Sequence, residues 1–114
     1  TGAFVNAGAI ARYIRKAAPQ TVSLVSMGWE AERECVEDIL CAEFIKSRLM
    51  GNDPDFAEIA KKIRASETGD KFRNPDYPWL PAEDLDLCLS LDVFDFVLRC
   101  DPDTDPPCLK KVDI

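Results

Sequence analysis

The segment that most limits the fold is a β-rich run at residues 21–26 (TVSLVS), which lies between two stretches of helical periodicity. Residues 7–18 before it repeat apolar side chains at helical spacing, and the pattern resumes after Gly28. The first five residues (TGAFV) have the composition of a short buried strand that leads into the first helix. Strand, helix, strand and helix in this order predict an α/β fold, with helices covering a parallel sheet.

The remaining elements follow from periodicity and from Gly and Pro positions. The helix after Gly28 begins at Ala31 or at Val36 and ends before Gly51, and Asp53 is the expected cap of the next helix. Beyond it the sequence predicts a helix at about 54–65, an ordered loop at 66–81, a helix at 81–89, a strand at 93–98, a turn at 101–107 and an edge strand at 108–112.

The chain has no histidine and carries a net charge of -7, from 14 Lys plus Arg against 21 Asp plus Glu. Without imidazole, Ser–His and Cys–His nucleophile pairs and nearly all transition-metal sites are excluded, whereas carboxylates and hard metals such as Mg²⁺ remain. Phosphates repel an acidic chain, so neither nucleic acid nor a membrane is an expected partner. The first 50 residues carry six basic and six acidic side chains, so all of the net charge lies after residue 50.

The five cysteines are an odd number and show no C-x-x-C spacing. We expect reduced thiols, with Cys41 and Cys88 as small core residues of helices. Arg33 is the only basic residue near Cys35 and Cys41 in the sequence, so a catalytic thiol is not expected.

Two places have the composition of an anion site. Asn6, Ala7 and Gly8 open the first helix, where free N–H groups and the helix dipole favour a phosphate, although Asn6 is more commonly a plain helix cap. Gly28 follows the β-rich run, where ligands bind in open α/β sheets, and it equally suits a turn with unusual backbone angles.

The third candidate is the acidic pair Glu37 and Asp38. If the helix begins at Val36, both carboxylates lie in its first turn, where anions are stabilised. A carboxylate pair beside a phosphate-binding turn also suits Mg²⁺, which prefers oxygen ligands. The competing interpretation is a solvated acidic face that also includes Glu30, Glu32 and Glu34.

These motifs, taken in order, resemble a known family. The pattern G-x-F-x-N-A-x-A at residues 2–9, a strand ending at Gly28, and E-D-x-x-x-A at residues 37–42 resemble the second half of 2-phosphosulfolactate phosphatase. Residues 86–97 are similar to the closing helix and strand of that family. The resemblance covers nearly the whole chain, but family members are about twice as long.

The resemblance implies a cytoplasmic, Mg²⁺-dependent hydrolase that converts 2-phosphosulfolactate to sulfolactate and phosphate on the route to coenzyme M. It implies a three-layer α/β/α fold around a mixed sheet, of which residues 1–114 form the C-terminal half, inactive alone. Its partners are then a small phosphorylated anion and either the missing N-terminal half or a second copy. Asn6, Ala7, Gly8 and Gly28 face the substrate, and Glu37 and Asp38 hold metal or water. The alternative is a non-catalytic α/β module that binds an anion or a partner.

Overall fold

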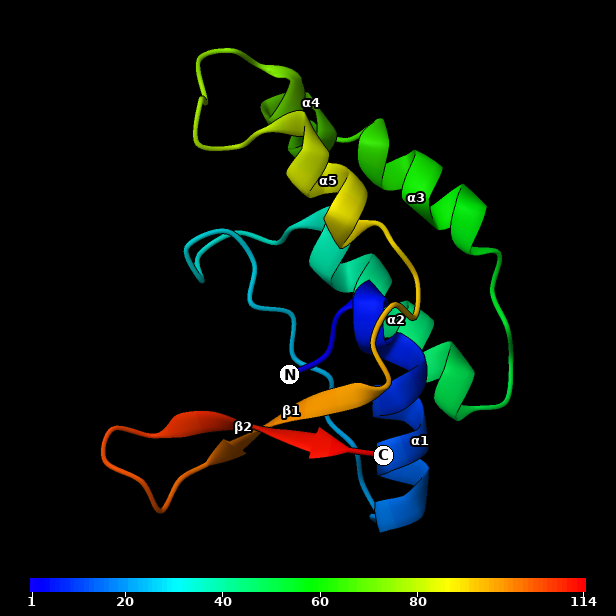
Figure 1. Ribbon diagram of the computed structural model, residues 1–114. Helices are drawn as coiled ribbons and strands as arrows, with labels where there is room; N and C mark the ends of the chain where they lie inside the picture. Colours follow the sequence, from blue (N-terminus) through cyan, green and yellow to red (C-terminus); the bar gives the residue numbers. More distant parts are fainter.

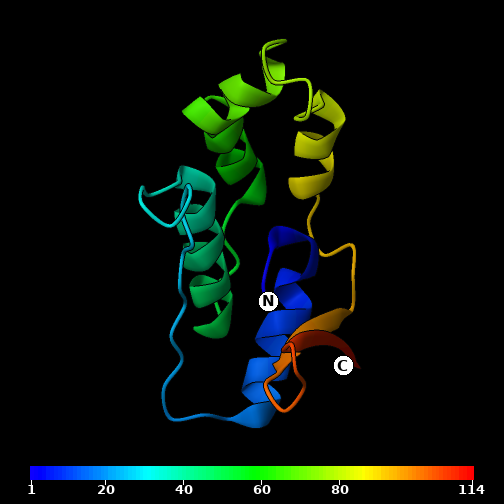
Figure 2. The same ribbon diagram turned by 90° about the vertical axis from the view of Figure 1, so that its left-hand side faces the viewer.

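A computed structural model describes all 114 residues and contains helices together with one two-stranded sheet, an α/β composition (Figure 1). In both views α1 and the strand hairpin lie at one end of the molecule, and α3, α4 and α5 gather at the other (Figures 1 and 2). The elements are η1 (Phe4–Asn6), α1 (Ala7–Ala17), α2 (Val36–Leu49), α3 (Phe56–Arg64), α4 (Glu67–Arg73), α5 (Ala82–Cys88), β1 (Phe96–Asp101) and β2 (Cys108–Asp113).

The two strands form an antiparallel hairpin in which Phe96 lies opposite Asp113 and Asp101 lies opposite Cys108. The predicted edge strand at 108–112 is confirmed, and the preceding strand begins three residues later than expected. The shift has a local cause, because the N–H groups of Asp92 and Phe94 donate to the carbonyl oxygens of Phe4 and Val5 instead of to a strand. The residues just before β1 are therefore held against η1 by these hydrogen bonds.

The β-rich run is not a strand in this structure, which corrects the prediction for residues 21–26. Residues 19–27 are extended between α1 and α2 (Figure 2), but none of their backbone groups has a backbone hydrogen-bond partner. A strand requires a neighbouring strand, and no other segment lies against this one in register. The strand predicted for residues 1–5 is also absent, because residues 4–6 form the 3₁₀ helix η1. The three-layer arrangement stays a prediction.

The boundaries of α2 and α5 follow the sequence pattern, and the cap of α3 is corrected. Helix α2 begins at Val36, the later of the two predicted starts, and α5 matches its predicted range. The cap of α3 is Asp55 rather than Asp53, because the Asp55 carboxylate accepts the N–H groups of Ala57 and Glu58.

The predicted loop at 66–81 contains a helix, α4. Acidic residues occupy its first turn and basic residues its last, a charge order that complements the helix dipole. Gly69 allows α4 to lie against the end of α3, since a Cβ atom there would overlap the backbone carbonyl of Arg64. A glycine that reads as a helix breaker in the sequence therefore serves helix packing.

An aromatic triangle forms the centre of the core. The rings of Phe4, Phe44 and Phe56 lie 5.1–5.8 Å apart, centroid to centroid, in tilted or edge-on contacts. Only 13 of the 114 residues are buried, and the extended segment contains strongly exposed apolar residues, with Val25 77% and Met27 70% exposed. None of the helices combines the length and the apolar composition needed to cross a bilayer.

Candidate active site

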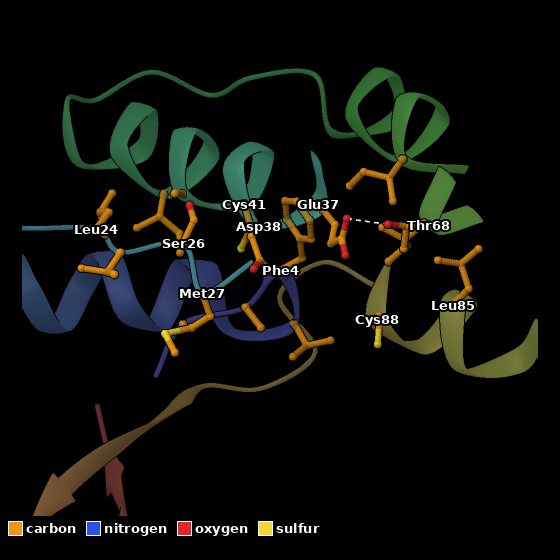
Figure 3. Close-up of a pocket in the computed structure, with 18 of the residues that line it drawn as sticks. Phe4, Leu24, Ser26, Met27, Glu37, Asp38, Cys41, Thr68, Leu85 and Cys88 are labelled. Carbon is orange, nitrogen blue, oxygen red and sulfur yellow. Dashed lines mark hydrogen bonds between the residues drawn. The ribbon is translucent and has the colours of Figure 1, made fainter. Parts of the chain in front are cut away.

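The main cavity, of about 710 Å³, lies between the extended segment, η1, α2 and α5 (Figure 3). Of the 21 residues that line it, 15 are hydrophobic, and Glu37 and Asp38 are the only charged ones. Both carboxylates belong to the first turn of α2. Two ionisable groups of one sign in an otherwise apolar cavity form the strongest candidate for a functional site.

Asp38 is held in place by Gly28. The Gly28 N–H donates to Oδ2 of Asp38 at 2.7 Å, so the turn after the β-rich run and the start of α2 are joined. Gly28 has a φ of +71°, and a Cβ atom there would overlap the carbonyl oxygen of Arg33. Only glycine fits this turn, which is the second of the two roles predicted for Gly28, whereas its predicted role in ligand binding stays a prediction. The second carboxylate oxygen of Asp38, Oδ1, accepts no hydrogen bond from the protein.

Glu37 is fixed by a residue that the sequence analysis did not identify. The hydroxyl of Thr68 donates to Oε2 of Glu37 at 2.7 Å (dashed line in Figure 3). Thr68 belongs to α4, which the sequence pattern presents as a loop. The order of charges, with Glu67 and Asp70 early and Lys71 and Arg73 late, is the signal that predicts this helix.

The nearby thiols are poor nucleophiles. Burial raises the pKa of Cys41 to about 11, with the Asp38 charge adding to the effect. Burial, followed by the charges of Glu37 and Asp38, also raises the pKa of Cys35. Since the thiolate is the reactive form, the site depends on carboxylates rather than on sulfur. All five cysteines are free, and Cys88 is exposed rather than part of the core as predicted, because its side of α5 faces the open cavity.

The N-terminus of α1 does not join this site. Gly8 donates its N–H to Oδ1 of Asp92 at 2.6 Å, so a carboxylate of the chain already occupies the predicted anion position. Ala7 is fully buried in the core. Oδ1 of Asn6 accepts the N–H of Ala3 rather than capping α1. Of the six predicted site residues, only Glu37 and Asp38 line the cavity, and Gly28 is joined to them through its hydrogen bond to Asp38. Asn6, Ala7 and Gly8 do not line the cavity.

Basic groups near the carboxylates come from two elements. A second cavity of about 220 Å³ contains Arg33 and Lys71, and it shares Thr68 with the main cavity. The Lys71 ammonium lies 3.7 Å from the centroid of the Trp29 ring and pairs with Glu67 at 3.1 Å. Arg33 and Lys71 therefore lie in the cavity that adjoins the site, and sequence analysis missed Lys71 because it lies in α4.

The donor set of the cavity fits Mg²⁺ as a partial site. Magnesium is commonly bound by one or two carboxylates, with water and substrate phosphate oxygens as the other ligands. Glu37 and Asp38 supply two carboxylates from one helical turn, and each is oriented by a hydrogen bond. No group of three or more His, Cys, Asp or Glu side chains is arranged to hold a metal ion. Any Mg²⁺ here requires further oxygen ligands from outside the chain.

The fold and site define an α/β protein whose candidate centre is a carboxylate pair. A family model for 2-phosphosulpholactate phosphatase matches residues 1–102. A protein of Bacillus subtilis (strain 168) named "Probable 2-phosphosulfolactate phosphatase" is 31% identical over 77 residues, which cover 67% of this chain and 34% of that protein. A protein of Gloeobacter violaceus with the same name is 39% identical over 70 residues, covering 61% of this chain and 29% of that protein.

The chain therefore belongs to the 2-phosphosulpholactate phosphatase family. It spans about a third of the length of the curated relatives that it matches. No solved structure matches the chain.

Proposed function

We propose that this chain supplies the acidic centre of a Mg²⁺-dependent phosphatase that hydrolyses 2-phosphosulfolactate to sulfolactate and phosphate. The observation that carries the proposal is the position of Glu37 and Asp38, the only charged residues of the main cavity in a chain of this family. The proposal includes a cytoplasmic location and the route to coenzyme M, both of which rest on the family resemblance alone.

In this proposal the two carboxylates have separate roles. Asp38 is oriented through Oδ2 by Gly28, which leaves Oδ1 as the oxygen that would hold the metal. Glu37, oriented by the Thr68 hydroxyl, orders the attacking water and accepts its proton. When bound, Mg²⁺ neutralises charge on the phosphate and orients it for displacement. Water supplies the new oxygen on phosphorus, the bond from phosphorus to the sulfolactate oxygen breaks, and that oxygen receives the proton that Glu37 accepted from water.

The chain alone is proposed to be inactive. A substrate with phosphate, carboxylate and sulfonate groups requires several cations, and no basic residue lines the main cavity. Arg33 and Lys71 lie in the adjoining cavity and are paired with Glu67. The other cations are expected from the part of the family domain that this chain does not contain.

The test is phosphate release from 2-phosphosulfolactate by the complete enzyme, with and without Mg²⁺, compared with a phosphorylated acid that lacks the sulfonate. We expect release that requires Mg²⁺ and that is faster with the sulfonated substrate. If the folded enzyme releases no phosphate from 2-phosphosulfolactate, the proposed substrate assignment is contradicted. If the rate of phosphate release is the same before and after a chelator removes divalent metal, the proposed Mg²⁺ dependence is contradicted.

A second candidate function is a non-catalytic module that binds a partner. The carboxylate of Asp92 on the Gly8 N–H favours it, because an internal anion already fills one expected substrate position. In that case Glu37→Gln leaves the activity of the complete enzyme unchanged, whereas the phosphatase proposal requires a large loss.

A further inference from the structure

The second cavity, which we name the Trp29–Lys71 pocket, adjoins the main cavity and has a volume of about 220 Å³. One wall comes from residues 29–36, which precede and begin α2, and the other comes from residues 66–71 at the start of α4. Both walls belong to this chain. Ordinary small-molecule sites have volumes of about 300–1,000 Å³, so this pocket fits one group of a ligand rather than a whole ligand.

Lys71 presents a half-buried cation to this pocket. Its side chain is 17% exposed, and its ammonium lies 3.7 Å from the centroid of the Trp29 ring. A charge that is partly shielded from water interacts more strongly with an anion than a fully solvated charge does. The ammonium has three N–H donors, and Glu67 at 3.1 Å is its only ion-pair partner. Lys71 therefore retains donors for a ligand.

Glu67 occupies the position of an anionic ligand. Its carboxylate also lies 3.9 Å from the guanidinium of Arg33, so the two cations share one carboxylate. Glu67 and Arg33 are both well exposed, and exposed ion pairs contribute little to stability, so an incoming anion replaces Glu67 at small cost. The carboxylate is close to Lys71 and more distant from Arg33. An anion with three oxygens is better suited to contact both cations at once.

The turn that carries Trp29 and Arg33 holds their side chains side by side. The two residues form an isolated antiparallel bridge, in which the Trp29 N–H donates to the carbonyl oxygen of Arg33 at 2.7 Å. Between them, Glu30 and Ala31 have φ values of +55° and +58°, which residues other than glycine rarely adopt. Costly backbone conformations of this kind persist where the surrounding structure enforces them, and they are common in ligand clamps.

The Trp29–Lys71 pocket begins beside the carboxylate pair. Thr68 lines both cavities, and its hydroxyl donates to Oε2 of Glu37 at 2.7 Å (Figure 3). Cys35 lines the pocket and directly precedes α2, whose first turn carries Glu37 and Asp38. An acidic centre and a pair of cations therefore adjoin one another. Charges of opposite sign at neighbouring places hold a molecule with two different anionic groups in one orientation.

We propose that the Trp29–Lys71 pocket binds the sulfonate group of the substrate, with Lys71 and Arg33 as its direct partners and Glu67 as the anion that it displaces. The identity of the substrate rests on the proposed function, whereas the anion site itself does not depend on the reaction. The phosphate of the same molecule then lies toward Glu37 and Asp38. Phosphorylated acids without a sulfonate lack the contacts in the pocket, so the pocket sets substrate specificity.

The test measures the binding of methanesulfonate to residues 1–114 through the fluorescence of Trp29, at constant ionic strength and in a Trp79→Phe background. Trp79 is exposed and lines neither cavity, so its replacement leaves the pocket intact. We expect weak, saturable binding, because a ligand of few atoms gains little affinity. Acetate is expected to bind at least about threefold more weakly, because it has two oxygens rather than three.

The first pair of variants tests the cations. Lys71→Met removes a cation of the pocket, and Lys62→Met removes an exposed cation that lines neither cavity. We expect Lys71→Met to weaken methanesulfonate binding by about tenfold or more and Lys62→Met to change it by less than about twofold. Arg33→Met changes an exposed side chain, so it tests the same pocket without altering α4, and it is expected to weaken binding by about fivefold.

The second pair of variants tests the displaced carboxylate. Glu67 and Glu34 both line the pocket, but only Glu67 contacts the two cations. Glu67→Gln is expected to strengthen methanesulfonate binding by about threefold or more, whereas Glu34→Gln changes it by less than about twofold. A gain in affinity cannot result from a general loss of folding.

In the complete enzyme the readout is selectivity, the ratio of kcat/KM for 2-phosphosulfolactate to kcat/KM for 2-phospholactate. Lys71→Met is expected to lower this ratio by about tenfold or more, and Lys62→Met to leave it within about twofold. A complete enzyme that hydrolyses neither compound contradicts the proposed function, and the methanesulfonate titration of residues 1–114 still decides whether the pocket binds a sulfonate.

Four results overturn the proposal. They are a Trp29 signal that does not respond to methanesulfonate, equal losses of affinity in Lys71→Met and Lys62→Met, a Glu67→Gln variant that binds no more tightly than the parent, and an active Lys71→Met enzyme with unchanged selectivity. If acetate binds as tightly as methanesulfonate, the pocket is assigned to a carboxylate group, and the sulfonate assignment is overturned.

Discussion

The N-terminal regions of α1 and α2 both carry a carboxylate that accepts a backbone N–H, but their surroundings differ. At α1, Asp92 accepts the N–H of Gly8 and forms an ion pair with Arg48 at 2.6 Å. At α2, Asp38 accepts the N–H of Gly28 and belongs to no ion pair, and the same is true of Glu37 beside it. The Asp92 carboxylate is neutralised within the chain, whereas Glu37 and Asp38 line an apolar cavity and form no ion pair.

This difference distinguishes a carboxylate that is paired within the chain, Asp92, from one that is available to a ligand, Asp38. A charge that is paired and hydrogen-bonded within the chain joins elements that are distant in the sequence, as Asp92 joins α1 to α2 through Arg48. Glu37 and Asp38 are half-buried and form no ion pair, so they remain available to a ligand in the cavity. In the proposed function, the α1 end therefore contributes stability and the α2 end contributes chemistry.

The largest expected loss of stability is at the turn that holds Asp38. Gly28→Ala introduces a Cβ atom that overlaps the carbonyl of Arg33, so we expect the free energy of unfolding to fall by about 3 kcal/mol. The control is Gly51→Ala, which shares a positive φ but has no atom within 4 Å of the new Cβ. It should lose about 1 kcal/mol. Equal losses in urea titrations would show that the contact with Arg33 does not matter.

The next effect concerns thiol reactivity at the α2 end. The pKa of Cys41 is raised to about 11, so at pH 8 its thiolate is scarce. We expect iodoacetamide to modify Cys41 roughly tenfold to a hundredfold more slowly than the exposed Cys88. The difference should narrow as the pH rises toward 11, because the thiolate then forms. Peptide mass spectrometry measures both sites, and equal rates at pH 8 would contradict the burial of Cys41.

At the α1 end, Asp92→Ala removes the hydrogen bond to Gly8 and the pairing with Arg48. We expect a loss of about 2 kcal/mol in unfolding free energy, because a charged hydrogen bond and a favourable helix-dipole contact are lost together. Asp53→Ala is the control, since Asp53 pairs with the same Arg48 but is 84% exposed. If both variants lose equal stability, the bond to the α1 end is unimportant.

The smallest expected effect is at Thr68. Thr68→Val removes the hydrogen bond to Glu37 and should cost about 1 kcal/mol or less. Thr21→Val, in the extended segment, should leave the thermal midpoint unchanged. A stability loss at Thr68 as large as that of Gly28→Ala would mean that Glu37 is held mainly for folding.

The sequence predicted the α2 end better than the α1 end. Glu37, Asp38 and Gly28 lie within eleven residues of one another, so local pattern and helix-start rules were enough to place them together. Asp92 lies 84 residues from Gly8, and nothing in its local sequence indicates that it caps α1. Tertiary contacts of this kind are set by the whole fold.

The elements show the same division. The helix pattern and the edge strand at 108–112 were predictable because their signals are local. The run at 21–26 has strand composition, yet pairing depends on a partner strand that no local signal supplies. Helix α4 was missed because Gly69 reads as a breaker, whereas its role is to allow close contact with α3.

The most direct test of the carboxylate assignment compares Asp38→Asn with Asp92→Asn in the complete enzyme. Phosphate release from 2-phosphosulfolactate is measured with Mg²⁺ at a temperature where circular dichroism shows both variants folded. The account predicts that Asp38→Asn lowers kcat by at least about a hundredfold and that Asp92→Asn changes it by less than about threefold. A large loss of kcat in Asp92→Asn together with an unchanged kcat in Asp38→Asn would contradict the assignment of Asp38 to the site.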